Sequence, residues 1–207
     1  MSLEYDYIIA GGGSAGCVLA SRLANKSKDS ICLVEAGGSG KNLFIKMPAG
    51  NGFIFGNPKF DWGYHSVKQA QLNNRKIYFA RGKGLGGTSI VNGMVYIRGV
   101  AQDYDNWRQM GLDGWGYSDL LPYFKYSEGS TNRQNKFHGN QGPLKVEPAR
   151  NFSVLDESFI KAAVETGHEF LDDFNANKRA GVSRIDSTTY QGISCLLYTS
   201  PSPRDQR

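Results

Sequence analysis

Residues 11–16, with the spacing Gly-x-Gly-x-x-Gly, constrain the fold of this chain more than any other feature. They follow a short apolar run, residues 5–10, and precede residues 14–25, whose apolar side chains recur at helical spacing. A second apolar run, residues 30–34, ends directly before Glu35. This order predicts a strand, a tight glycine turn, a helix and a second, parallel strand, which form one βαβ unit of an α/β fold. We expect both strands to be buried.

Each glycine of this segment has a physical role in binding a dinucleotide. Gly11 permits the tight turn, Gly13 leaves space for a diphosphate, and Gly16 lets the helix and the strand pack closely. The N–H groups and the dipole at the start of the helix stabilise phosphate charge. Glu35 lies 19 residues after Gly16, where its carboxylate suits ribose hydroxyls and would repel the 2′-phosphate of NADP. The unit therefore predicts a site for NAD or FAD.

The distribution of glycine favours FAD. The chain has 26 glycines among 207 residues, about twice the usual share of roughly 7%. They gather at residues 11–13, 37–38 and 82–93. The last cluster offers backbone N–H groups, the hydroxyls of Thr88 and Ser89 and an amide, which together suit a flat, polar ligand. A ligand that spans two clusters must be long, so FAD is favoured, and an NAD site with a purely structural second cluster is the alternative.

The rest of the chain predicts short elements. Residues 40–76 show no sustained period and predict an irregular excursion. We expect a short strand at residues 77–80 and helices at 89–95, 103–111, 118–127 and 152–166. Ser118 is predicted to cap its helix, and Pro122 is then tolerated only in the first turn. The last helix is predicted to be amphipathic, with Leu155, Phe159, Ala162 and Ala163 on one face and Gly167 as its C-cap.

Composition excludes several classes of function. The net charge of +5 comes without a run of five like charges, so we expect no nucleic-acid partner. No apolar run reaches the roughly 20 residues of a membrane span, and we expect a soluble, cytoplasmic protein. The three cysteines form no CxxC pair, so we predict neither a disulfide framework nor a metal site. The aromatic residues are predicted to pack in the core rather than to form a stacking platform: Trp62, Tyr64, Trp107 and Trp115.

From about residue 4 to residue 194 the chain resembles the N-terminal part of the glucose–methanol–choline (GMC) oxidoreductases, and within that family their choline-dehydrogenase-like bacterial branch. The resemblance rests on motifs that stand in the family's order. They are residues 5–16, 34–37, 81–93, 96–99, 103–107, 114–115, 122–124 and 138–144. It implies a Rossmann-like FAD-binding βαβ core with the beginning of a second, substrate-binding α+β domain.

The resemblance also implies which residues bind FAD. They are Gly11, Gly13, Ser14, Ala15, Gly16, Glu35, Ala36, Arg81, Gly82, Gly86, Gly87, Thr88, Asn92, Gly93, Met94 and Val95. Some relatives carry a histidine that bonds covalently to the flavin at the position that Val91 matches. Since valine cannot form that bond, we expect FAD to be bound non-covalently.

The reaction that the resemblance implies is oxidation of an alcohol, by hydride transfer to flavin N5 after a histidine base removes the hydroxyl proton. Family members are more than twice as long as this chain, and their catalytic histidine lies near the far C-terminus. We therefore name no catalytic residue, and we expect His138, in the family's His-Gly turn, to be structural. The alcohol, the electron acceptor, and the choice between oxidase and dehydrogenase stay open.

The end of the chain differs in style from the rest. Residues 196–207 show no periodicity, and they resemble the translation of a sequencing adaptor. We expect residues 1–195 to be an N-terminal fragment with part of the substrate domain, inactive by itself and with some apolar surface exposed. The alternative is a genuine disordered tail on a short, non-catalytic flavin-binding protein.

Overall fold

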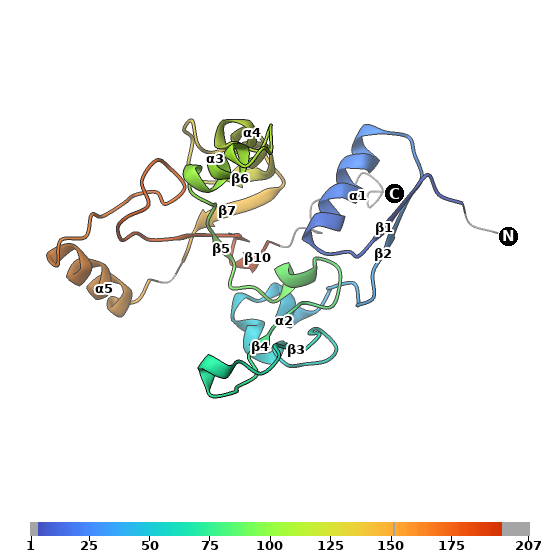
Figure 1. Cartoon of the computed structure of the whole chain (residues 1–207), viewed down its shortest axis with the longest axis horizontal. Helices are drawn as coiled ribbons and strands as arrows, with labels where there is room; N and C mark the ends of the chain where they lie inside the picture. Colours follow the sequence, from blue (N-terminus) through green and yellow to red (C-terminus); the bar gives the residue numbers. More distant parts are fainter. Residues whose placement is uncertain (1–3, 151, 196–207) are drawn as a thin grey trace. The chain divides into compact units, whose positions relative to one another are not determined.

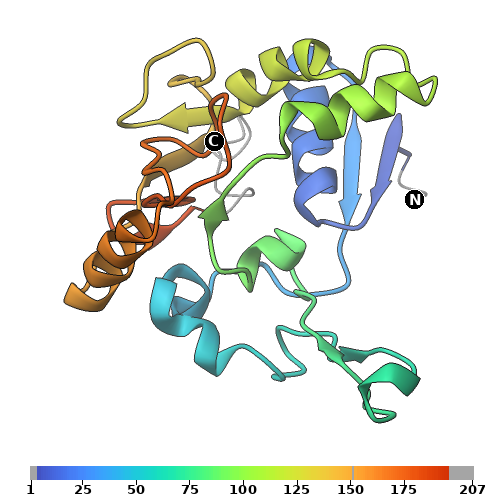
Figure 2. The same ribbon diagram turned by 60° about the vertical axis from the view of Figure 1, so that its left-hand side comes forward.

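The computed structural model describes residues 4–150 and 152–195, which divide into two compact units. The first unit holds the chain up to Gly93 and again from Ile193, and the second holds Met94–Gly192. Figures 1 and 2 show the chain from two directions. Both units combine helices and strands, which confirms the predicted α/β class. The adaptor-like segment, residues 196–207, lies outside the described residues.

The first unit begins with the predicted βαβ arrangement. Its elements are β1 (Tyr7–Ala10), α1 (Ser14–Lys26) and β2 (Ile31–Val34). β1 and β2 pair in parallel, and both views show α1 beside them (Figures 1 and 2). Ile9 is buried toward α1, whereas Ile8 is 68% exposed. The prediction of buried strands is therefore wrong for one face, because successive side chains alternate between the faces and α1 covers only one of them.

The remainder of the first unit consists of short elements, as predicted for residues 40–76. They are α2 (Leu43–Lys46), the 3₁₀ turns η1 (Pro48–Phe53), η2 (Ala70–Leu72) and η3 (Gly87–Ile90), and the strands β3 (Tyr64–His65), β4 (Tyr78–Phe79) and β10 (Ile193–Ser194). β4 confirms the predicted short strand and pairs antiparallel with β3. A small apolar core of Ile45, Ile54, Ile90 and Val91 lies under these segments.

The helix predicted at residues 89–95 is wrong. The 3₁₀ turn η3 ends at Ile90, and the chain is extended again in β5 (Val95–Tyr96). Met94 has a φ of +60°, in the left-handed region, which a right-handed helix does not contain. The backbone conformation near Gly93 therefore overrides the helical spacing of the apolar side chains.

The second unit is built on a four-stranded sheet with the strand order β5-β8-β7-β6. The other strands are β8 (Asp186–Ser187), β7 (Leu144–Pro148) and β6 (Glu128–Ser130), and β9 (Thr189–Tyr190) follows β8. β7 runs antiparallel to β8 and parallel to β6. Val146 in β7 and Glu128 in β6 are fully buried, so the centre of this unit contains a carboxylate as well as apolar side chains.

Two helices of the second unit pack through aromatic rings. α3 (Ala101–Gln109) and α4 (Tyr117–Ser127) confirm two predicted helices, and the ring of Tyr104 contacts the rings of Trp107, Tyr117 and Phe124. The predicted cap of α4 is wrong, because Gly116 is the N-cap and its N–H donates to the Asp119 carboxylate at 3.0 Å. Pro122 therefore lies in the helix interior rather than in the first turn.

The last helix, α5 (Val154–Glu165), confirms the predicted helix but not a packed face. Ser153 caps it, and Gly167, with a φ of +94°, follows its C-terminal cap, Thr166. Leu155 and Phe159 on the expected apolar face are 80% and 69% exposed. The apolar surface that the sequence led us to expect is therefore present on this helix.

Candidate dinucleotide site

The turn between β1 and α1 has the geometry that its glycines predict. Gly11 adopts a φ of +96°, which only glycine adopts readily. A Cβ atom at Gly16 would overlap the carbonyl oxygen of Gly11, so only glycine lets α1 start this close to the turn. A Cβ at Gly13 would meet no atom within 4 Å. Open space therefore lies at the first turn of α1, where N–H groups are unpaired within the helix and where anions bind.

The glycine clusters lie against one another in the structure. The N–H of Gly86 donates to the carbonyl of Gly12 at 2.7 Å, and a Cβ at Gly87 would lie 2.7 Å from the Cα of Gly13. The N–H of Leu85 donates to the carbonyl of Gly38 at 2.9 Å. The cluster at residues 82–93 therefore lies against both the start of α1 and residues 37–38, although it is about 70 residues away from the former in the chain.

Glu35 follows β2 and holds two of these clusters by its carboxylate. One oxygen accepts the N–H of Gly12 at 2.7 Å, and the other accepts the N–H of Gly37 at 2.8 Å. Each carboxylate oxygen has a second lone pair. The side chain therefore fixes the turn and still has acceptor capacity for a hydroxyl.

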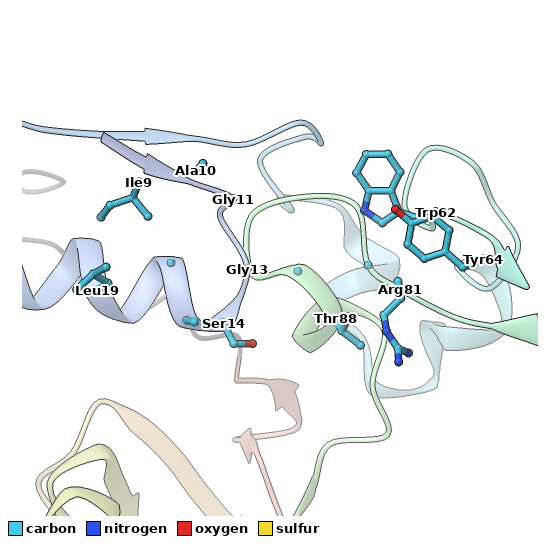
Figure 3. Close-up of a pocket in the computed structure, with 14 residues that line it drawn as sticks. Ile9, Ala10, Gly11, Gly13, Ser14, Leu19, Trp62, Tyr64, Arg81 and Thr88 are labelled. Atoms are coloured by element: carbon cyan, nitrogen blue, oxygen red, sulfur yellow. The ribbon is translucent and has the colours of Figure 1, made fainter. Parts of the chain in front are cut away.

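A pocket of about 740 Å³ opens at the start of α1 (Figure 3). Nine of the sixteen residues expected to bind FAD line it: Gly11, Gly13, Ser14, Ala15, Gly16, Arg81, Gly82, Gly87 and Thr88. The pocket also includes residues that the sequence did not single out for this role: Ile9, Ala10, Leu19, Trp62 and Tyr64. This volume is within the usual range of ligand sites, roughly 300–1,000 Å³.

The other expected residues do not line this pocket. Gly86 and Glu35 instead stabilise the glycine turn beside the pocket, because both form hydrogen bonds with the backbone of Gly12. Ala36 follows Glu35 and is exposed. Asn92 and Gly93 end the first unit, and Met94 and Val95 begin the second.

Asp61 holds the backbone around Trp62 and Tyr64, two residues that line the pocket, in place. This residue is only 3% exposed, and it accepts hydrogen bonds from the backbone N–H groups of Gly56, Gly63 and Arg81 and from the hydroxyl of Tyr78. Burial alone would raise the pKa of Asp61, but these hydrogen bonds outweigh it and lower the pKa to about 2. A fixed carboxylate therefore joins the loop before β3 to the segment after β4.

Sequence reasoning missed Trp62 and Tyr64, which it assigned to core packing. Trp62 is 42% exposed and Tyr64 is 54% exposed, so neither is a core residue. A signal was available, because side chains two residues apart in extended chain point to the same side. The four-residue segment Asp-Trp-Gly-Tyr, residues 61–64, has that alternation.

His138 is buried in the second unit between two carboxylates. Its Nδ1 lies 2.7 Å from Glu128, its Nε2 lies 2.8 Å from Asp173, and Arg98 also pairs with Glu128. Burial alone would lower the pKa of His138, but the hydrogen bonds to Asp173 and Glu128 and their charges raise it to about 9. Both ring nitrogens are occupied, which supports the structural role expected of this residue.

Two further findings concern the described part of the chain. None of its helices has both the length and the apolar character needed to cross a membrane. No group of three or more histidine, cysteine or acidic side chains within residues 4–150 and 152–195 is arranged to hold a metal ion.

The parallel strand pair, the glycine turn and the helix that begins at the pocket define a dinucleotide-binding protein of the Rossmann type. The family model described as GMC oxidoreductase matches residues 5–194, and the chain belongs to that family. The family, together with a solved neighbour described as an FAD-dependent oxidoreductase, supports FAD as the cofactor. The open space at Gly13 and the unpaired N–H groups at the start of α1 fit its diphosphate.

The chain is similar to proteins described as oxygen-dependent choline dehydrogenases. It is 42% identical over 190 residues to an oxygen-dependent choline dehydrogenase of Sinorhizobium fredii, with 92% of this chain and 35% of that protein covered. A protein of the same description from Vibrio vulnificus is 39% identical over 195 residues, which are 93% of this chain and 35% of that protein. The chain thus spans about a third of the length of these relatives.

Solved structures show the same fold. Pyridoxine 4-oxidase from Mesorbium loti matches with a TM-score of 0.89 and 32% identity, over 95% of this chain and 39% of that one. An FAD-dependent oxidoreductase from Chaetomium thermophilum matches with a TM-score of 0.87 and 30% identity, over 98% of this chain and 37% of that one.

Proposed function

We propose that this chain is the FAD-binding part of a longer enzyme that oxidises an alcohol to an aldehyde or a ketone. The observation that carries the proposal is the junction of the glycine clusters around the start of α1, in a member of the GMC oxidoreductase family. The relatives' names support an alcohol substrate, since choline and pyridoxine are both alcohols. A small alcohol is therefore the proposed substrate class.

The glycine turn and α1 bind the diphosphate of the cofactor in this proposal. Gly13 provides the space, and the backbone N–H groups of Ser14 and Ala15 at the start of α1 provide donors. No acidic side chain lies in the first turn of α1, so no carboxylate there opposes a phosphate. Glu35 accepts the ribose hydroxyls with its remaining lone pairs.

The second glycine cluster orients the other half of the cofactor. We assign this task to residues of the first unit: Arg81, Gly82, Gly86, Gly87, Thr88, Asn92 and Gly93. The roles expected of Met94 and Val95 stay predictions. Bound FAD supplies the hydride acceptor for the alcohol carbon. The residues of this chain hold and orient the cofactor.

We assign no catalytic base to the described residues. His138 is held between Glu128 and Asp173 in the interior of the second unit, so it is not positioned to accept a proton from a substrate. His65 is exposed, and its Nδ1 lies 3.0 Å from the carbonyl of Gly63. Activity is therefore a proposal for the longer enzyme, and cofactor binding is the proposal for this chain.

The test is a titration of the purified 207-residue chain with FAD, followed by flavin fluorescence and by calorimetry. Saturable 1:1 binding of FAD, with no binding of NADH at the same concentrations, is the expected result. Binding of NADH in preference to FAD would contradict the proposal and would identify a nicotinamide-dependent dehydrogenase. Parallel assays of the longer gene product with choline and other small alcohols test the substrate class.

A further inference from the structure

Trp62 and Tyr64 form an exposed pair of rings that the proposed function does not yet use. The two ring planes are 9° from parallel, with centroids 6.1 Å apart. The rings are 42% and 54% exposed. Both residues line the pocket at the start of α1, on the side of Arg81 (Figure 3).

The ring pair is held in place from three directions. Asp61, directly before Trp62, accepts the N–H of Gly63 at 2.9 Å and the N–H of Arg81, in the segment after β4, at 3.0 Å. The N–H of Trp62 donates to the carbonyl of Arg81 at 2.9 Å, and Tyr64 pairs with Phe79 in the neighbouring strand. A rigid aromatic surface of this kind binds a flat ring with little loss of side-chain entropy.

Charge on this surface also suits a polar ring system. The Lys83 ammonium lies 4.8 Å from the Trp62 ring centroid, within the range of a cation–π interaction. Arg81 lines the pocket beside the two rings. The surface thus combines aromatic area with positive charge, which matches an electron-poor ring that carries carbonyl oxygens.

The position of Glu35 decides which half of FAD reaches the rings. Glu35 is the expected acceptor for the ribose of the adenosine half, and it lies beside Gly12 and Gly37, outside the pocket that Trp62 lines. With the diphosphate at Gly13, the adenosine half extends toward Glu35. The half that remains in the pocket is the one that carries the flavin ring.

We propose that Trp62 and Tyr64 form a stacking surface for the isoalloxazine ring of FAD. This inference rests on the proposed function, because it assumes that the pocket binds FAD, and it adds residues that neither the glycine motifs nor the family resemblance supplied. Stacking on an aromatic side chain contributes about tenfold or more to the affinity for a flat base, and we expect a similar effect here.

The experiment compares FAD with ADP on the full chain. Trp62→Ala and Tyr64→Ala are expected to weaken FAD binding by about tenfold each and to leave ADP binding within about twofold. Trp115→Ala is the matched control, because Trp115 is an exposed tryptophan of the second unit that does not line the pocket. Circular dichroism and thermal unfolding report whether each variant keeps its fold.

A second measurement needs no substitution in the ring pair. The chain has three tryptophans, so the double variant Trp107→Phe, Trp115→Phe leaves Trp62 as the sole tryptophan emitter. FAD should quench this emission strongly, and ADP should leave it nearly unchanged. Emission that stays unquenched when FAD is bound would overturn the inference even if Trp62→Ala does not fold.

The outcomes separate the inference from the proposed function. If the wild-type chain binds ADP and FAD equally well, or if the Trp62 and Tyr64 variants lose both ligands equally, the rings do not stack on isoalloxazine and the inference is overturned. Unchanged affinity for FAD in both variants also overturns it, while the proposed function stands. If the wild-type chain binds neither ligand, the proposed function itself fails.

Discussion

Two glycines of the same turn serve different purposes. A side chain at Gly16 would collide with the carbonyl of Gly11, whereas a side chain at Gly13 would project into open space at the pocket. Gly16 is therefore needed so that α1 can pack against the turn, whereas Gly13 leaves space for a ligand. Gly13 also has a φ of −71°, which any L-residue can adopt.

This difference predicts that alanine at Gly16 lowers stability and that alanine at Gly13 weakens FAD binding. Gly16→Ala should lower the free energy of unfolding by roughly 1–3 kcal/mol, because the overlapping atoms are backbone. Gly13→Ala should leave that free energy within about 0.5 kcal/mol and weaken FAD binding by at least about tenfold, since its methyl group occupies ligand space. Urea unfolding and FAD titration of both variants measure the two effects. Equal losses of stability would refute the assignment.

His138 contributes a protonated imidazole to the interior of the second unit. Glu128 and Asp173 bind its two nitrogens, Arg98 neutralises the remaining charge of Glu128, and Arg133 lies 4.0 Å from Asp173. The pKa of about 9 in the folded chain exceeds the value of 6.5 for an unperturbed histidine. The protonated form is therefore bound more tightly by the folded state than by the unfolded state.

The sign of this shift predicts a loss of stability in mild alkali. The contribution of His138 is fully present below about pH 6.5 and is lost as the pH rises through about 9. We expect the free energy of unfolding to fall by roughly 2–3 kcal/mol over that interval. His138→Gln should remove most of this pH dependence. Urea denaturation at several pH values measures it, and an unaltered slope in the variant would contradict the assignment.

At the scale of elements, the β3–β4 pair is stabilised by Asp61 more than by hydrogen bonds between its two strands. Each strand has only two residues, and such a short hairpin has little stability by itself. The buried carboxylate accepts hydrogen bonds from Gly56 before β3, from Tyr78 in β4 and from Arg81, two residues after β4. The hydrogen bonds to this one side chain therefore stabilise a strand pair that is too short to form many hydrogen bonds of its own.

We predict that Asp61→Ala lowers the free energy of unfolding by about 2–4 kcal/mol, because it leaves buried N–H groups without an acceptor. Asp113→Ala, in an exposed loop of the second unit, is the control and should change little. The contribution of Asp61 is present above about pH 3.8 and is lost as the pH falls toward 2. Denaturant titrations at pH 7 and at acid pH test both statements; equal effects of the two substitutions would argue against this role.

At the scale of the whole molecule, a core position bears on the mode of FAD attachment that we predict. Val91, which stands where some relatives have a flavin-linked histidine, is 2% exposed and packs with Ile45, Ile54 and Ile90. An aliphatic side chain forms no bond to a flavin. We therefore expect the proposed complex to be reversible, with a stability that depends on the concentration of FAD.

We predict that acid precipitation of the FAD-loaded chain releases all of the flavin into the supernatant. Absorbance of the supernatant and of the redissolved pellet measures the two fractions. Retention of flavin on the washed pellet would show a covalent link and would contradict the prediction. Before precipitation, excess FAD should raise the melting temperature, because it binds only the folded state.

The sequence predicted most of the local elements and nine of the fourteen residues that line the pocket. The order of apolar runs and glycines specified β1, α1 and β2, and the periodicity of side chains specified α3, α4 and α5. The start of α4 was wrong because the N-cap is Gly116, whose N–H donates to the Asp119 carboxylate, rather than Ser118. Trp62 and Tyr64 were assigned to the core because aromatic residues usually pack there, and spacing alone does not reveal exposure.

The sequence by itself determined the glycine turn, since Gly11 and Gly16 are needed for conformational and steric reasons that are local to the chain. Only the tertiary structure decided that residues 82–87 lie against that turn, and that Asp61 brings two rings to the same pocket. Local conformational preferences depend on neighbouring residues, which the sequence shows directly. Contacts between distant segments depend on the packing of the whole unit, and no periodicity in the sequence reports them.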